Sequence, residues 1–279
     1  MVGKKKRRRK RKRNKFTQNK VSDEWSLYHI NIRNLDARLA SMESILAVNA
    51  FSVVTINETH FHAGRKVILS GYTSYSRNRV DKASGGITTS VLESDSPNCL
   101  RVEEGINQNE FLVTRHSQFE TPINIINIYG QQECRLSKEE IDAHWNEVMV
   151  AVAKAEARKE SILIVGDLNR AVGKIVPGNT AKESYGGKLL KNFVESNDYV
   201  LLNATDKVVN GPWTRVDPTN SETKSVLDMI IVSKDLEQYI DTLQIDSERR
   251  FTPFKQNKGK TLSFPDHFGL CLKFKRNPP

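Results

Sequence analysis

The sequence contains little cysteine and no long apolar segment. Its 279 residues include three cysteines, Cys99, Cys134 and Cys271, and none of them stands in a Cys-x-x-Cys or mixed Cys/His spacing. This odd, scattered set argues against both a disulfide framework and a zinc site, and it indicates reduced cysteines in an intracellular protein. No stretch approaches the roughly 20 apolar residues that span a bilayer, and the N-terminus lacks the apolar segment of a signal peptide. We therefore expect neither membrane insertion nor secretion.

Positive charge is in excess, but it is concentrated in one short segment. The chain carries 43 Lys and Arg against 33 Asp and Glu, a net charge of +10. The segment KKKRRRKRKRNK, residues 4–15, is basic except for Asn14 and accounts for the excess, so the remainder is close to neutral. Such a segment cannot bury apolar area, and its charges repel one another. We expect a disordered tail over residues 1–22, suited to nuclear import or to phosphate contact. The alternative is a solvated extension without a particular partner.

Apolar runs with the period of a strand alternate with helical patterns in the rest of the chain. Helices are predicted at 36–48, 137–159 and 186–197, and Ser137 with Glu140 forms a capping box for the second. The predicted strands are 25–32, 51–57, 85–92, 99–104, 110–117, 122–130, 161–169, 199–203, 225–233 and 268–274. There is no internal repeat and no second linker. Residues 23–279 are therefore predicted to form one α/β domain with mixed sheets.

Several polar residues stand where the predicted strands end. Strand ends in an α/β sandwich can converge on one rim, where ligands usually bind. Taken singly, each residue could close a turn, lie in an exposed loop or pack as an ordinary side chain. The ordered set is unusual, and its members are Asn31, Glu58, Tyr129, Asp167, Asn169, Asp266 and His267.

Asp228 differs from this set because it lies inside the apolar run VLDMII. A charge there is costly unless it is paired, so we expect Asp228 to have a partner. Five other histidines are expected to be solvent-facing or structural and receive no assigned role: His29, His60, His62, His116 and His144.

Seven stretches carry a resemblance to a known superfamily. They are HINIRNL, INETHF, ASGGITTSV, INIINIYG, LIVGDLN, TKSVLDMIIVS and FPDHFGL, in this order along the chain. Together they resemble the exonuclease–endonuclease–phosphatase superfamily, to which deoxyribonuclease I and the apurinic/apyrimidinic endonucleases belong. YGGKLLKNFVESNDYVLLN, followed by GPWTRVDPTNSETKSVLDMIIVS, is most similar to the endonuclease domain of LINE-type non-LTR retrotransposons. The resemblance implies a four-layer α/β sandwich, with two packed mixed β-sheets flanked by helices.

The resemblance implies a divalent-metal-dependent DNA endonuclease that leaves a 3′-hydroxyl and a 5′-phosphate. A retroelement can use that 3′-hydroxyl as a primer for reverse transcription. Hard oxygen ligands without a Cys/His cage favour Mg²⁺, with Mn²⁺ as the alternative. The resemblance implies that Glu58 binds the metal, assisted by Asn31 and Asp266. It also implies the catalytic groups: Asp167 to deprotonate water, Asn169 to position it, His267 and Tyr129 to donate to the phosphate, and Asp228 to hold His267.

The resemblance implies that the protein binds DNA, together with a reverse transcriptase domain or the RNA of the retroelement. We expect a monomer, and the basic segment at residues 4–15 suggests that it acts in the nucleus. Segments that the superfamily uses beside its cleft suggest the following DNA contacts: Arg170, Trp213, Thr214, Arg77 and Arg79. For each, a solvated loop position is an equal alternative.

Other functions stay open at this point. An abasic-site endonuclease fits the same motifs, whereas the Trp-Cys-Asp-Arg signature of inositol phosphatases is absent and no secretory or membrane segment favours a sphingomyelinase. A catalytically decayed nucleic-acid-binding domain is the alternative from another class. It is suggested by Pro265, which stands where the superfamily usually has Ser or Thr and which has neither a hydroxyl nor a backbone N–H. The titratable residues are nevertheless all present, which favours an active nuclease.

Overall fold

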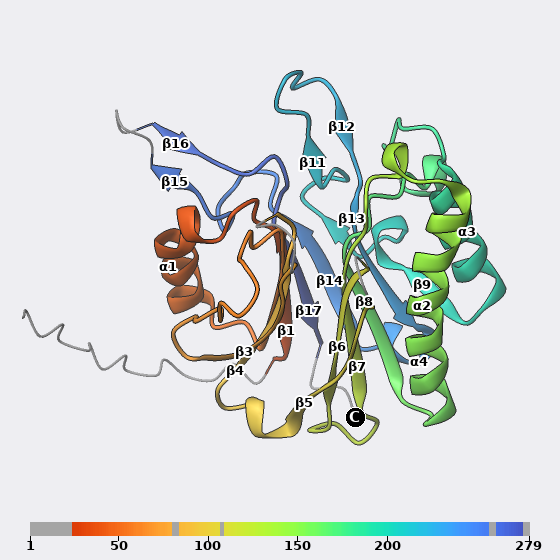
Figure 1. Ribbon diagram of the computed structural model, residues 1–279, viewed down its shortest axis with the longest axis horizontal. Coiled ribbons are helices and arrows are strands. Elements are labelled where there is room, and N and C mark those ends of the chain that lie inside the picture. The colour runs from red at the N-terminus through yellow and green to blue at the C-terminus, as the bar shows by residue number, and fades with distance from the viewer. Residues whose placement is uncertain (1–23, 80–83, 107–108, 257–260, 276–279) are drawn as a thin grey trace, which may run out of the picture.

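Two mixed β-sheets packed face to face form the centre of the computed structural model, which describes residues 24–79, 84–106, 109–256 and 261–275 (Figure 1). The basic tail predicted at residues 1–22 lies outside the described residues. In the described parts of the chain, the first sheet has seven strands in the order β10-β14-β17-β1-β2-β4-β3. Their bounds are β1 Ser26–Asn31, β2 Val53–Asn57, β3 Tyr72–Arg77, β4 Ile87–Leu92, β10 Val208–Val209, β14 Ile240–Ile245 and β17 Leu270–Phe274. β1 and β2 are parallel, as a strand–helix–strand opening requires.

The second sheet has six strands within the described residues, in the order β5-β6-β7-β8-β13-β9. Their bounds are β5 Cys99–Glu104, β6 Glu110–His116, β7 Ile123–Tyr129, β8 Ser161–Asp167, β9 Tyr199–Leu201 and β13 Asp228–Ser233. β7 runs parallel to β8, and β13 runs antiparallel to β8 with Asp228 opposite Asp167. Two short hairpins project from the same edge of the sandwich in Figure 1. They are β11 (Arg215–Val216) with β12 (Lys224–Ser225), and β15 (Lys255–Gln256) with β16 (Leu262–Ser263).

Helices cover the outer face of each sheet. Their bounds are α1 Leu39–Asn49, α2 Lys138–Ala157, α3 Tyr185–Ser196 and α4 Lys234–Glu237, with short 3₁₀ helices at Asp36–Arg38, Ser96–Asn98, Glu133–Arg135, Gly173–Ile175 and Leu202–Ala204. The predicted capping box begins α2, with the Ser137 hydroxyl accepting from the Glu140 N–H at 3.2 Å and the Glu140 carboxylate accepting from the Ser137 N–H at 2.8 Å. No helix in the described part of the chain is both long and apolar enough to cross a bilayer.

The core consists of three apolar layers that alternate with the sheets and helices. Met42 and Leu46 of α1 pack against the outer face of the first sheet, and Val148 and Val152 of α2 pack against the outer face of the second. A third cluster lies between the sheets and includes Leu27, Val53, Ile125, Leu163 and Leu272. The order helix–sheet–sheet–helix confirms the predicted four-layer α/β sandwich. The three cysteines are free, as predicted, with Cys99 and Cys271 buried and Cys134 exposed.

Candidate active site

The facing sides of the two sheets change from apolar to polar toward one rim. Side chains on a strand alternate between the two faces of a sheet, so every second residue of β1 points toward the other sheet. On β1 these positions are Leu27, then His29, then Asn31, and all three are fully buried. On β2 the sequence Val53, Thr55, Asn57 follows the same course. Because β1 and β2 are parallel and in register, their polar ends lie side by side.

The second sheet presents its polar residues at the same rim. Tyr129 ends β7 and Asp167 ends the parallel strand β8, and the two are direct partners in the sheet. Asp228 begins β13 opposite Asp167, so it stands at the end of the strand, whereas the sequence placed it within an apolar strand. The predicted convergence of strand ends therefore brings these carboxylates together.

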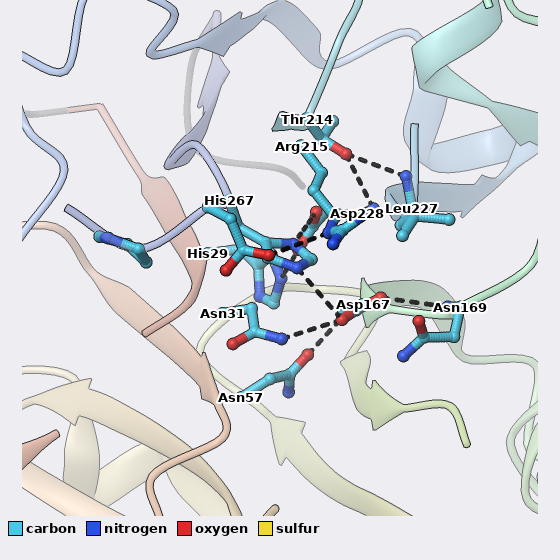
Figure 2. A network of polar contacts seen from close by, with 12 residues as sticks. His29, Asn31, Asn57, Asp167, Asn169, Thr214, Arg215, Leu227, Asp228 and His267 are labelled. Atoms are coloured by element: carbon cyan, nitrogen blue, oxygen red, sulfur yellow. Dashed lines mark hydrogen bonds and ion pairs between the residues drawn. The ribbon is translucent and has the colours of Figure 1, made fainter. Parts of the chain in front are cut away.

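Asp228 holds His267, the candidate catalytic histidine, in place (Figure 2). Its Oδ2 atom lies 2.7 Å from Nδ1 of His267, and its Oδ1 atom lies 3.3 Å from Nε2 of His29. The other ring nitrogen of His267, Nε2, faces Asp167 with 3.8 Å to Oδ2. The expected partner of Asp228 is thus present, and the fully buried His29 is a second one. His29 had no role in the sequence prediction.

The charges of this cluster favour an imidazolium. Burial alone lowers the pKa of His267, but the Asp228 and Asp167 carboxylates outweigh it and raise the pKa to about 9. Burial raises the pKa of Asp228, yet its pKa is held well below the ordinary value because of the interactions with His267 and His29. At neutral pH the pair is therefore an ion pair, with the Nε2–H of His267 directed toward Asp167.

Asp167 is positioned by three amide groups. Its backbone N–H donates to Oδ1 of Asn57 at 2.8 Å, and its Oδ2 accepts from Nδ2 of Asn31 at 2.9 Å. The backbone N–H of Asn169 donates to its Oδ1 at 3.1 Å, and the Asn169 side chain donates to the Gly130 carbonyl at 2.8 Å. Burial raises the pKa of Asp167 to about 7, with the His267 charge opposing it. A carboxylate with such a pKa is suited to accept a proton near neutral pH.

Glu58 forms the more open part of the rim. Its carboxylate accepts hydrogen bonds from the Tyr129 hydroxyl at 2.7 Å, from Nδ2 of Asn31 at 3.1 Å and from Nε2 of His60 at 3.0 Å. Burial would raise the pKa of Glu58, but these donors outweigh it and hold the pKa at about 2. Glu58 has a φ of +55°. Strained backbone of this kind occurs at functional sites, where the surrounding structure holds it.

Glu58 and Asn31 fit a hard divalent cation. The Glu58 carboxylate is ionised and its side chain is 20% exposed, while Asn31 is shared between Glu58 and Asp167. Ionised carboxylate and amide oxygens without cysteine are the donor set that Mg²⁺ and Mn²⁺ prefer. A buried group of Asp167, Asp228 and His267 also brings ligand atoms within 4.8 Å of one another. Within this group, Nδ1 of His267 and Oδ2 of Asp228 are hydrogen-bonded to each other at 2.7 Å, and the predicted cation site at Glu58 stays a prediction.

Asp266 lies between two arginines. Its Oδ1 atom accepts from Nη1 of Arg33 at 3.1 Å, and its Oδ2 atom accepts from Nε of Arg215 at 3.0 Å. Its predicted role as a metal ligand that assists Glu58 stays a prediction beside these ion pairs. Neither arginine was singled out from the sequence, because both contacts join residues far apart in the chain.

The predicted DNA contacts divide into buried and exposed positions. Thr214 is fully buried, and its hydroxyl accepts from the backbone N–H groups of Leu227 and Asp228, both at 3.0 Å (Figure 2). It therefore positions Asp228, which corrects the prediction of a DNA contact. Trp213 fits the prediction better, because it is partly exposed on the hairpin side and stacks with Lys224 at 4.2 Å.

The three predicted arginines have partners inside the protein. Arg79 forms two hydrogen bonds of 2.9 Å to Glu110. Arg77 bonds the Asn109 carbonyl and lies 3.7 Å from Glu104. Arg170 is 8% exposed and donates to the Gln131 carbonyl at 2.9 Å. These guanidiniums support the loops around the rim through partners that sequence cannot pair, and their DNA contacts stay predictions.

Sequence reasoning missed Asn57. The residue is fully buried and joins the sheets, accepting from the Asp167 N–H and donating to Oδ1 of Asn127 at 2.8 Å. One signal could have found it, because Asn57 continues the inner-face positions of β2 just before Glu58. His60 was likewise assigned no role, although it contacts Glu58.

Comparisons with known proteins agree on the fold. No protein-family model matches the sequence, and no curated protein matches it. The solved structure of the AP endonuclease LMAP from Leishmania major has a TM-score of 0.69 at 13% identity, over 91% of this chain and 88% of that one. The 3′ phosphatase NExo from Neisseria, bound to a product DNA hairpin, has a TM-score of 0.68 at 13% identity, over 90% and 99%. The endonuclease domain of TRAS1, a telomere-specific non-LTR retrotransposon, has a TM-score of 0.63 at 14% identity, over 91% and 99%.

These neighbours are all proteins with the fold that the sequence motifs indicated. The likeness extends over about nine-tenths of this chain. The chain therefore has the fold of the exonuclease–endonuclease–phosphatase superfamily.

Proposed function

We propose that the protein is a divalent-metal-dependent DNA nuclease that hydrolyses a phosphodiester bond. The observation that carries this proposal is the His267 imidazolium, held by Asp228 at 2.7 Å and facing Asp167 at 3.8 Å. Phosphodiester hydrolysis needs a donor for the charge that develops on phosphate oxygens and a base for the attacking water. These two residues supply both groups side by side at the rim.

The chain's own groups would act as follows. The Nε2–H of His267 donates to a non-bridging phosphate oxygen and stabilises the pentacovalent transition state. Asp167 takes a proton from water, whose oxygen bonds to phosphorus while the bond to the 3′ oxygen breaks and that oxygen gains a proton from solvent. The side-chain carbonyl of Asn169 orients this water, since its amide nitrogen is fixed on Gly130. The expected products are a 3′-hydroxyl and a 5′-phosphate.

Glu58 and Asn31 would hold Mg²⁺ or Mn²⁺, which supplies neutralisation of the phosphate oxygens when bound. Tyr129 fixes the Glu58 carboxylate from one side and His60 from the other. Their donors keep Glu58 ionised, which is the form that a cation requires. Asp266 supports the site through Arg33 and Arg215.

We further propose that the nick serves a retroelement, in which the 3′-hydroxyl primes reverse transcription in the nucleus. Support comes from the LINE-like stretches of the sequence and from the likeness to the TRAS1 domain. A repair-type activity on abasic sites is the second candidate, supported by the similar likeness to AP endonuclease LMAP.

End-group analysis and substrate comparison test these proposals. The nicked product should be sealed by DNA ligase and extended by a polymerase without prior end treatment, since both reactions need the expected ends. Cleavage of an intact duplex at a rate similar to that of an abasic duplex supports the retroelement role. A preference for the abasic duplex of a hundredfold or more would assign the protein to repair, and ends that resist ligation would contradict the proposed chemistry.

A further inference from the structure

A pocket of about 520 Å³ opens beside the catalytic rim. It begins one residue from His267, because the neighbouring Asp266 lines it. Its other walls come from the loop before α1, from the β11–β12 hairpin and from the β15–β16 hairpin, which gather at the same edge of the sandwich (Figure 1). The site described above uses none of these walls except Asp266 and the Arg33 bound to it.

The pocket is lined by more positive than negative side chains. Its charged residues are Arg33, Arg38, Arg249, Lys255, Asp217 and Asp266. Asp266 is already shared by Arg33 and Arg215. Asp217 accepts hydrogen bonds within its own turn, from Thr219 and Asn220. Both carboxylates thus have other partners, and four basic side chains line the pocket against these two acidic ones.

Arg38 is a buried cation that forms no ion pair with the described carboxylates, although Asp266 attracts it from a greater distance. It is 5% exposed, its Nη1 donates to the Arg33 carbonyl at 2.7 Å, and its buried Nε has no acceptor. No carboxylate within the described ranges lies at ion-pairing distance from it. A buried charge is costly unless it is paired and hydrogen-bonded. An unpaired guanidinium that lines a pocket is therefore evidence for an anionic ligand.

Arg249 is a second arginine that lines this pocket. It donates to the Pro265 carbonyl at 2.7 Å and lies 4.6 Å from the centre of the Phe268 ring. It too has no ion-pair partner among the carboxylates that the structure describes. Its position is fixed by these contacts, and Asp246 and Asp266 oppose its charge at longer range only. Lys255 contributes a further cation from β15.

We propose that this pocket is a phosphate-binding subsite, which takes a backbone phosphate of the substrate strand next to the scissile one. Guanidinium groups match phosphate oxygens in shape and donate in pairs, and Arg38 and Arg249 are held ready to do so. The step from His267 to Asp266 places the pocket directly beside the reacting phosphate. This assignment of the phosphate to the substrate strand rests on the proposed nuclease function. Asp266 then serves to hold Arg33 at the mouth of the pocket.

The first test uses inorganic phosphate and thermal unfolding. Phosphate should raise the Tm of the wild type above its value in chloride at equal ionic strength. Arg38→Met should keep or raise the Tm without phosphate, because it removes an unpaired buried charge, and it should abolish the phosphate-dependent rise. Lys191→Met, a surface lysine of α3 beside Glu183 and Glu195, is the control that keeps the rise. Lys255→Gln, at a partly exposed position, tests the charge without disturbing the core.

The second test measures duplex DNA binding in EDTA by fluorescence anisotropy, so that cleavage does not interfere. Arg38→Met and Lys255→Gln should each weaken binding about tenfold. Each should lower the slope of log K against log salt by about 1, as expected for one lost phosphate contact. A neutral methylphosphonate beside the nick position should weaken binding by the wild type but not by Arg38→Met.

The outcomes separate the two proposals. If the wild type fails to nick DNA but phosphate and DNA binding depend on Arg38, the subsite stands and the nuclease function falls. If the wild type nicks DNA and both variants bind DNA and phosphate as it does, the subsite is refuted. A Tm rise with phosphate or a mononucleotide but unchanged DNA affinity would indicate a free-nucleotide pocket and overturn the assignment. A Tm loss of several degrees in Arg38→Met without phosphate would indicate a structural arginine.

Discussion

Replacing Asp228 by Asn removes the charge that keeps His267 protonated. Asp228 is fully buried and lies 2.7 Å from Nδ1 of His267, so Asn preserves the shape but not the ion pair. Without that carboxylate, burial is opposed by Asp167 and Asp266 alone, so the pKa of His267 falls from about 9. At pH 7.5 a group with a pKa of about 9 is roughly 97% protonated, whereas one at the ordinary histidine value of about 6.5 is roughly 9% protonated.

A fall of the pKa to the ordinary histidine value would by itself lower the nicking rate about tenfold at pH 7.5, and the lost orientation of the ring adds to it. The sign of the pH shift is also fixed. Lowering the pKa of His267 moves the alkaline limb of the activity profile to lower pH, so the variant should lose least activity under mildly acidic conditions. In the wild type that limb should lie near pH 9.

Two measurements check this prediction. Nicking rates between about pH 6 and about pH 10 give the limb, and an NMR titration of the histidine ring gives the pKa of His267 without any substrate. Asp142→Asn is the matched control, since Asp142 accepts a hydrogen bond from Tyr185 on the outer helices. A variant in which His267 keeps a pKa near 9 and the alkaline limb does not move would refute the role given to Asp228.

Three further substitutions test separate parts of the site. Glu58→Gln should abolish tight Mn²⁺ binding, measured by calorimetry, and should reduce the nicking rate at least about a hundredfold with the fold intact. An unchanged Mn²⁺ affinity would show that the metal binds at another site. Thr214→Val leaves the backbone N–H groups of Leu227 and Asp228 without an acceptor and should lower the free energy of unfolding by about 2–4 kcal/mol. Thr214→Ser keeps the acceptor and should not lower it. Weaker DNA binding without lost stability would restore the DNA-contact role. Pro265→Ser restores a hydroxyl beside the phosphate site and should increase the nicking rate; a rate no higher than wild type would show that this hydroxyl is irrelevant.

Residues that follow the local period of a strand were predictable from sequence. The apolar alternation of β1, β2, β7 and β8 placed Asn31, Glu58, Tyr129 and Asp167 at strand ends, and parallel registers then brought them together. Three strands of the first sheet escaped prediction because they lack that alternation. Tyr72–Arg77 is mostly polar and only partly buried after Tyr72, Ile240–Ile245 contains Asp and Gln that break the apolar run, and Val208–Val209 has two residues only.

The charge partners were not predictable, because they join residues that are distant in the chain. Arg79 resembles a DNA-contacting loop residue until Glu110, on another strand, is placed beside it. Asp266 matched a metal-ligand motif, but the two guanidiniums that bind it come from the loop after β1 and from a hairpin. Thr214 could not be recognised as an internal acceptor before its hairpin was folded over β13. Local pattern thus located the rim, whereas tertiary packing decided which charges on it are available.

Mg²⁺-dependent nicking of supercoiled plasmid DNA, compared between the wild type and Asp167→Asn, gives the decisive result. Asn keeps the shape of Asp167 and its hydrogen bond to the Asn169 N–H, but it cannot take a proton from water. We predict conversion of supercoiled to open-circular DNA by the wild type with Mg²⁺ and not with EDTA, and a rate at least about a hundredfold lower for Asp167→Asn at an unchanged Tm. Nicking at the wild-type rate by Asp167→Asn, or nicking that persists in EDTA, would contradict the assignment of this site as a metal-dependent nuclease.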